Sequence, residues 1–182
     1  MPSNPLLPFP RMSLLKWLGL AHEKADTGNR LAEIERILAP FGKEKARYLA
    51  CFAYILTRPA RADHQVSDIE AALMAQLIAA RTGVTHEQAA TIVHVAREAA
   101  SQSGGTEDFL VTREFERIAS REEKLELLDC LFAVGAADDS ILTVEDNEVR
   151  RVASELKLEH SDYIDVRRRH VAQLKVLQRP AD

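Results

Sequence analysis

A short acidic element occurs twice in this chain, and this repeat constrains the fold more than any other feature. Asp63 stands seven residues before Glu70, and Asp138 stands seven residues before Glu145, so the two copies lie 75 positions apart. Each copy has an apolar residue at the same place between its two acids, and each leads into an amphipathic stretch. Self-similarity at a fixed interval predicts two halves of similar structure that share one core.

The apolar residues around the two copies recur at helical rather than strand spacing. In the stretch from residue 43 to 57, for example, Ala46, Leu49 and Leu56 fall on one face. The sequence contains no alternating run of β-branched residues and no Asn-Gly or Asp-Gly turn. We therefore predict an all-α fold, a helical bundle of about seven to nine helices with an internal pseudo-twofold repeat. Its halves span about residues 43–100 and 121–177.

Local signals mark the expected helix boundaries. A capping box places a hydroxyl side chain before a helix and Glu or Gln three residues later. The predicted N-caps are Ser67, Thr85, Ser120, Thr143 and Ser161. Gly83 fits a helix C-cap, and Arg58-Pro59 is expected to end the helix before the first acidic element. Residues 101–105 are predicted to be a flexible break.

The length of 182 residues suits a single domain with a sizeable core. We assign a helical domain to residues 29–177, a mobile or weakly ordered segment to residues 1–28, and a tail to residues 178–182. Residues 1–10 contain four prolines and do not fit the apolar region of a signal peptide, and Met12 is a candidate for the natural start. No apolar run reaches the length of a membrane span. The sequence therefore predicts a cytoplasmic protein with no membrane span.

The charge balance argues against a nucleic-acid partner. The chain carries 28 acidic and 24 basic side chains, a net charge of -4, so no general attraction to phosphates is expected. Aromatic residues make up only 5%, too few to favour a base-stacking surface. The basic run at residues 167–170 is predicted to be a solvated helix face, with a docking surface for an acidic partner as the alternative.

Catalytic signatures are missing from the sequence. It has no Gly-x-Ser-x-Gly, no Walker loop and no dinucleotide fingerprint. It also lacks the Glu-x-x-His pairs of carboxylate-bridged di-iron bundles. Cys51 and Cys130 lie in apolar helical stretches and are predicted to be buried free thiols; the alternative is a pair that the repeat brings together. These observations favour a protein that is not an enzyme.

The two acidic elements are the candidate functional site. Glu70 completes a capping box with Ser67, and the helix dipole favours a carboxylate at a helix start, which accounts for Glu70 and partly for Glu145. Capping does not account for Asp63 and Asp138, which lie outside the helices. Four carboxylates brought together repel one another unless a cation neutralises them, and hard divalent ions prefer oxygen ligands. The spacing is not that of an EF-hand. A cation site and capping with solvated charge are both open interpretations.

Four segments carry a resemblance to a known family. Residues 62–70 and 137–145, the two acidic elements, resemble the tellurite-resistance TerB family. Residues 106–115 and 128–134 are similar to its uncharacterised bacterial branch. The likeness extends over roughly residues 12–177, and the order and doubling of the short motifs make it more specific than any single one.

The resemblance implies an all-helical fold with an internal twofold and an acidic patch that binds a divalent metal ion. The candidate metal ligands are Asp63, Glu70, Asp138, Glu145 and, one helical turn further, Glu148. The usual glycine after the first Asp is replaced by His64 in one copy and by Asp139 in the other, which bears on loop geometry and metal affinity. Both residue types tolerate a left-handed backbone better than most. Relatives occur fused to DnaJ-type co-chaperone domains, whose His-Pro-Asp signature does not occur in this sequence.

We therefore expect a TerB-like protein that binds calcium, zinc, magnesium or manganese at the paired elements. A protein partner is expected on an exposed helical face, and the role is that of a metal-binding adaptor in a bacterial stress or tellurite-resistance response. One alternative is a metal-free helical interaction scaffold, in which the acids only cap helices. The other is a metal-dependent hydrolase, which would need an open coordination position in a pocket.

Overall fold

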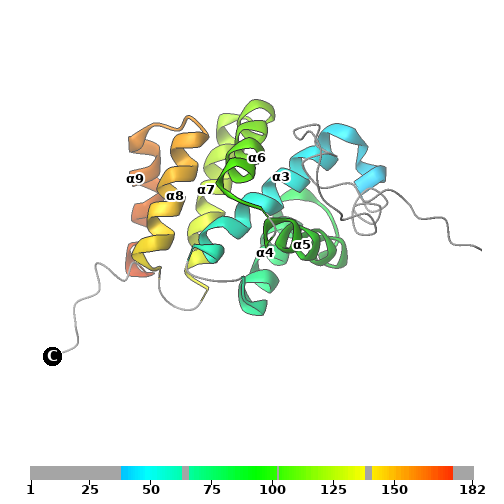
Figure 1. Ribbon diagram of the computed structural model, residues 1–182, viewed down its shortest axis with the longest axis horizontal. Coiled ribbons are helices and arrows are strands. Elements are labelled where there is room, and N and C mark those ends of the chain that lie inside the picture. Colours follow the sequence, from blue (N-terminus) through cyan, green and yellow to red (C-terminus); the bar gives the residue numbers. More distant parts are fainter. Residues whose placement is uncertain (1–37, 63–65, 102, 138–140, 174–182) are drawn as a thin grey trace, which may run out of the picture.

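The computed structural model describes residues 38–62, 66–101, 103–137 and 141–173, and these residues form an all-α bundle without β-strands (Figure 1). The elements are η1 (Ala39–Phe41), α3 (Gly42–Arg61), α4 (Asp68–Thr82), α5 (His86–Ser101), α6 (Gly105–Ile118), α7 (Arg121–Gly135), α8 (Thr143–Glu155), α9 (His160–Arg169) and η2 (Val171–Gln173). The predicted all-α fold is confirmed. The pseudo-twofold relation between the halves stays a prediction, and the segments expected at residues 1–28 and 178–182 lie outside the described residues.

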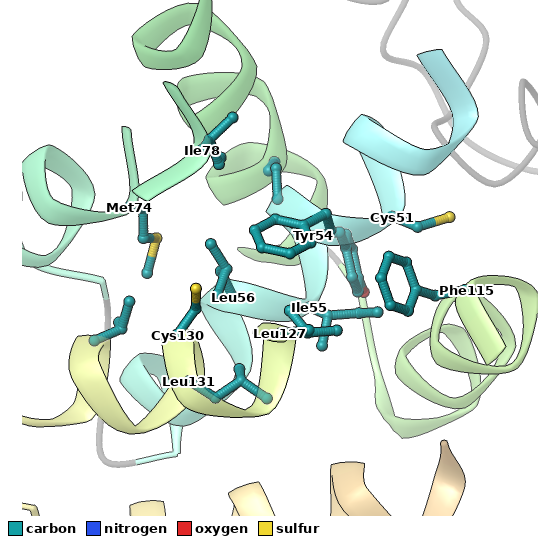
Figure 2. Close-up of a cluster of buried hydrophobic side chains, with 14 of the residues drawn as sticks. Cys51, Tyr54, Ile55, Leu56, Met74, Ile78, Phe115, Leu127, Cys130 and Leu131 are labelled. Atoms are coloured by element: carbon teal, nitrogen blue, oxygen red, sulfur yellow. The ribbon is translucent and has the colours of Figure 1, made fainter. Parts of the chain in front are cut away.

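Helix α3 is the central element of the bundle. It packs against α4, α5, α6, α7 and α8, and every residue from 49 to 60 is buried. Figure 2 shows side chains of α3 between Met74 of α4 on one side and Phe115 of α6 on the other, with Leu127 and Cys130 of α7 nearby. The sequence predicted an amphipathic helix with one buried face. The burial of both faces corrects this, because five helices surround α3.

Helix α3 continues past the residue expected to end it. Pro59 lies inside the helix, and Arg61 is its last residue. Proline removes one backbone donor, but in the last turn this costs only one intrahelical hydrogen bond. The amide of Ala62 donates to the carbonyl of Pro59 at 2.9 Å, so the chain completes its final turn before the first acidic element.

Three of the predicted N-caps are confirmed. Ser67, Thr85 and Ser120 each accept from the backbone N–H three residues later, while the Glu or Gln at that position accepts from the N–H of the cap residue. Gly83 ends α4 with φ of 73°, the left-handed conformation that glycine adopts without a steric penalty. Helix α5 ends at Ser101 and α6 begins at Gly105, within the range where the sequence predicted a break.

Two predicted N-caps are wrong by one or two residues. Helix α8 has Leu142 as its N-cap, so Thr143 is its first helical residue, and α9 has Glu159 rather than Ser161 as its N-cap. In both helices an acid at the third position accepts the N–H of the cap residue, Glu145 from Leu142 at 2.6 Å and Asp162 from Glu159 at 3.0 Å. These carboxylates define the helix starts without a hydroxyl side chain at the cap.

Both cysteines are buried free thiols, as predicted. Cys51 lies on α3 and Cys130 on α7, and neither forms a disulfide. Burial raises the pKa of each thiol to about 12, because the apolar surroundings disfavour the thiolate. Since the thiolate is the reactive form, both side chains are expected to be inert core residues.

A buried carboxylate on α6 makes stability depend on pH. Glu114 is 6% exposed and accepts hydrogen bonds from Arg117 of its own helix, at 2.9 Å from Nη2, and from Arg47 of α3. The hydrogen bonds from Arg117 lower the pKa of Glu114, and Arg47 lowers it further. Burial acts in the opposite direction, but the net effect is a lowered pKa. The folded state therefore holds the Glu114 proton less tightly than the unfolded chain does.

We expect Glu114→Gln to have a lower free energy of unfolding than the wild type at neutral pH. This difference should disappear in acid. A carboxyl whose pKa is lowered by folding stabilises the protein above its unfolded value of about 4.3, and this contribution disappears as the pH falls through the folded value. Urea unfolding at a series of pH values from neutral to acid should show the gap between the two proteins narrowing. A gap that stays constant would contradict the assignment. The exposed Glu87→Gln variant is the control and should follow the wild type.

Candidate functional site

Each acidic element lies between two consecutive helices. The first follows α3 and leads into α4, and the second follows α7 and leads into α8. Asp63 and Asp138 lie outside the described residues, as do His64 and Asp139, so the structure places only Glu70, Glu145 and Glu148 among the predicted ligands.

The glutamates of the two elements have the same local geometry. Oε2 of Glu70 accepts the N–H of Ser67 at 2.6 Å, and Oε2 of Glu145 accepts the N–H of Leu142 at 2.6 Å. Both glutamates occupy the third position of their helix, where the N-terminal dipole favours a negative charge. Both glutamates therefore cap their helices, each through one carboxylate oxygen.

The residues around the two glutamates also correspond. Val66 and Ile141 are buried, at 6% and 1% exposure, whereas Ile69 and Val144 in the second position of each helix are exposed. Each element thus inserts one apolar side chain into the core and directs another outward. In their described residues, the two elements therefore have similar local structure.

The second element lies against the end of α7. A Cβ placed on Gly135, the last residue of α7, would lie 3.8 Å from Cγ2 of Ile141 and 3.9 Å from Cβ and the carboxyl carbon of Glu145. Glu145 itself is only 4% exposed. The end of α7 therefore covers the carboxylate that caps α8.

The third described candidate, Glu148, is an ion-pair partner of Arg58. Oε1 of Glu148 accepts from Nε of Arg58 at 2.8 Å and lies 2.6 Å from Nη2, while Oε2 lies 3.4 Å from Nη1 of Arg151. Arg58 stands on α3 four residues before Ala62, and Glu148 stands three residues after Glu145. This pair holds the end of α3 against the first turns of α8.

The Arg58 guanidinium has an acceptor for each of its three nitrogens. Besides Glu148, it binds both carboxylate oxygens of Glu155 on α8, and Nη1 donates to Oγ1 of Thr112 on α6 at 2.7 Å. Burial acts to lower the pKa of Arg58, but the hydrogen bonds and charges of Glu155 and Glu148 outweigh it and raise the pKa above its usual value. The sequence signal for this network was a basic residue at the end of a long apolar run, which we interpreted only as a helix end.

The arrangement of helix ends brings the elements to one side of the bundle. Figure 1 shows the ends of α3 and α7 and the starts of α4 and α8 in the lower part of the view. Helix α3 contacts α4, α7 and α8, and α7 contacts α8, so these ends also belong to neighbouring helices. The helices that flank the two elements therefore belong to one packed group around α3.

The described acids match a divalent cation in chemistry but do not form a complete site. Carboxylate oxygens are the ligands that hard cations prefer. Among residues 38–62, 66–101, 103–137 and 141–173, however, no three His, Cys, Asp or Glu residues are gathered as metal ligands. Glu70, Glu145 and Glu148 have protein partners. A cation site at this place would therefore depend on Asp63 and Asp138.

Two further features of the surface are a pocket and a basic run. A pocket of about 570 Å³ between α3 and α5 is lined by Arg61, His94 and Arg97 among others. Much of the basic run at residues 167–170 is engaged, since Arg167 binds Asp146 and other members bind Asp129 and Asp165. Within the part of the chain that the structure describes, no helix is long and apolar enough to cross a membrane.

The fold and the paired helix-start acids define a class of protein: an all-helical domain with an acidic element before each of two helices. The family model of the tellurite resistance protein TerB matches residues 49–168, more than half of the chain. The chain belongs to the TerB family, as its sequence motifs predicted. Searches of curated proteins and of solved structures found no match.

Proposed function

We propose that this protein is a non-enzymatic, TerB-like adaptor that binds one divalent cation between its two acidic elements. The ion would order the two loops and thereby set the shape of an adjoining surface for a protein partner. Membership of the TerB family supports the further proposal that this role belongs to a bacterial stress or tellurite-resistance response. The candidate ligands are Asp63, Glu70, Asp138, Glu145 and Glu148.

The ion pair between Arg58 and Glu148 is the observation that supports this proposal most. Arg58 belongs to the last turn before the first element, and Glu148 to the second turn after the second element. This contact joins the helix that precedes the first element to the helix that follows the second, and it supports a site shared by the two elements. Convergence of carboxylates favours a cation, because the charges would otherwise repel one another.

The proposal predicts measurable ion binding that depends on both aspartates. Titration of metal-free protein with calcium, zinc, magnesium and manganese chlorides in a calorimeter should give a dissociation constant of about 10 μM or tighter for at least one ion. Asp63→Ala and Asp138→Ala should each weaken binding strongly, while Asp165→Ala, which removes an exposed acid on α9, should leave it unchanged. No binding of any of the four ions would refute the cation site.

A metal-free interaction scaffold is the second candidate function. The observation that favours it is the partner of each described acid: Glu70 and Glu145 cap helices, and Glu148 pairs with Arg58. On this alternative, Asp63→Ala and Asp138→Ala change no metal response and cost at most about 1 kcal/mol of stability. The hydrolase alternative gains no support from the pocket between α3 and α5, because none of Glu70, Glu145 and Glu148 lines it.

A further inference from the structure

A hollow of about 550 Å³ lies between α8 and the start of α9, two helices that stand side by side at the left of Figure 1. Its α8 side carries four polar side chains at offsets of three, four and seven residues from the first, which places them on one face of the helix: Asn147, Arg150, Arg151 and Ser154. Its α9 side includes Glu159, His160 and Tyr163. We call this hollow the α8–α9 groove. Its volume falls within the range of about 300–1,000 Å³ that is typical of small-molecule sites.

The polar side chains on the α8 side of the groove are accessible to a ligand. Asn147, Arg150 and Ser154 are exposed, and their side chains form no hydrogen bond or ion pair with another residue that the structure describes. Nη1 of Arg151 lies 3.4 Å from one oxygen of Glu148, and the arginine side chain is 68% exposed, so this pair is weak. Both guanidinium groups can therefore direct donors toward a molecule in the groove.

The α9 side of the groove contributes two rings, one of which is fixed in the core. Tyr163 is 5% exposed, and its hydroxyl donates to Asp146, which also binds Arg167. The exposed imidazole of His160 lies against Tyr163, with ring centroids 6.0 Å apart and an interplanar angle of 31°. A flat part of a ligand can pack on such a ring, next to the donors of α8.

The charge and the donors of the groove favour a phosphate group. Two arginines and one acid, Glu159, line the groove, so its lining is positive in a chain whose net charge is -4. Guanidinium groups bind carboxylates and phosphates through paired hydrogen bonds. A phosphate monoester has three terminal oxygens, and it can therefore accept from both arginines and from Asn147 or Ser154 at the same time. A carboxylate has only two oxygens for the same donors.

We propose that the α8–α9 groove binds a small molecule that carries a phosphate monoester next to a flat ring. Arg150 and Arg151 hold the phosphate, and the ring packs against His160. This inference goes beyond the proposed function, because none of the described acids of the candidate cation site lines the groove.

The test is a titration of the full chain, followed through its backbone amide signals by NMR at constant ionic strength and without divalent cations. The probes are phenyl phosphate, inorganic phosphate and benzoate, which has a ring and a carboxylate but no phosphate. The variants are Arg150→Gln, Arg151→Gln and His160→Ala. Arg113→Gln is the matched control, because it removes an exposed arginine of α6 that does not line the groove.

We expect phenyl phosphate to shift the amide signals of α8 and the start of α9 saturably, with a dissociation constant of about 1 mM or tighter. Arg150→Gln and Arg151→Gln should each weaken binding by about 10-fold, because each removes hydrogen bonds to a charged group. His160→Ala should weaken the binding of phenyl phosphate by about 3-fold and leave that of inorganic phosphate unchanged. Arg113→Gln should bind as the wild type does.

Four results would overturn the proposal or a part of it. Shifts that do not saturate, or that do not involve the groove, overturn it entirely. An equal loss in Arg113→Gln does so too, because it indicates attraction to the surface as a whole. Benzoate that binds as tightly as phenyl phosphate overturns the phosphate assignment. Inorganic phosphate that binds as tightly as phenyl phosphate overturns the role of the ring.

Discussion

Replacing Arg58 by Met is expected to lower the free energy of unfolding by about 3–5 kcal/mol, because it takes from two partly buried carboxylates the guanidinium that they share. The side chains of Glu148 and Glu155 are only 15% and 14% exposed, so water screens their charges poorly. Urea unfolding followed by circular dichroism measures the loss.

Two comparisons separate the Arg58 network from a general effect of losing an arginine. Arg168→Met removes an exposed arginine whose pair with Asp165 lies on the surface of α9, and it should change stability by less than about 0.5 kcal/mol. Neutralising both acids in the Arg58→Met background, with Glu148→Gln and Glu155→Gln, should recover part of the loss, because no buried charge then lacks a partner. A small effect of Arg58→Met alone would contradict the network.

Replacing Phe115 by Ala is expected to lower the free energy of unfolding by about 3–5 kcal/mol, because it opens a cavity among aromatic rings. Phe115 is fully buried, and its ring centroid lies 5.2 Å from that of Tyr48 and 6.1 Å from that of Phe52 on α3. These contacts join α6 to the central helix. The same unfolding experiment measures the cost.

Phe109 provides the matched control for this prediction. It lies on the same helix as Phe115 but is 44% exposed. Phe109→Ala should therefore cost far less, since the side chain contributes little buried area and leaves no enclosed cavity. Equal effects of the two substitutions would show that α6 does not pack as described.

Much of the fold could be predicted from the sequence because its signals are local. The capping boxes at Ser67, Thr85 and Ser120 and the left-handed Gly83 depend on residues within one turn of the helix end. The start of α8 was misplaced because Glu145 caps the N–H of Leu142 without a hydroxyl partner. Thr143 was predicted to be the N-cap because it carries a hydroxyl group and stands just before the helical pattern of apolar residues.

The burial of α3 on all sides could not be read from periodicity. Its apolar positions suggested one buried face, and only the packing of five other helices around it encloses the rest. The helix also carries Thr57 and Arg58, which sequence patterns assign to a surface or a helix end. Both are buried, Thr57 because its hydroxyl donates to the carbonyl of Tyr54 at 2.7 Å, and Arg58 because acids from another helix neutralise it.

The candidate site was predictable in part. The repeat identified Glu70 and Glu145, and their shared geometry follows from a position that is local to each helix. The partner of Glu148 could not be predicted, because Arg58 lies 90 residues away in the chain and no local pattern links the two. The ligand roles of Asp63 and Asp138 stay predictions.

The stoichiometry of ion binding tests the central claim most directly, namely that the two acidic elements form one site. Calorimetric titration should give one ion per chain, and Asp63→Ala and Asp138→Ala should each strongly weaken that single binding event, because each removes a ligand from the same site. Two ions per chain, one lost with each variant, would contradict the claim. So would a titration in which the wild-type protein binds no ion.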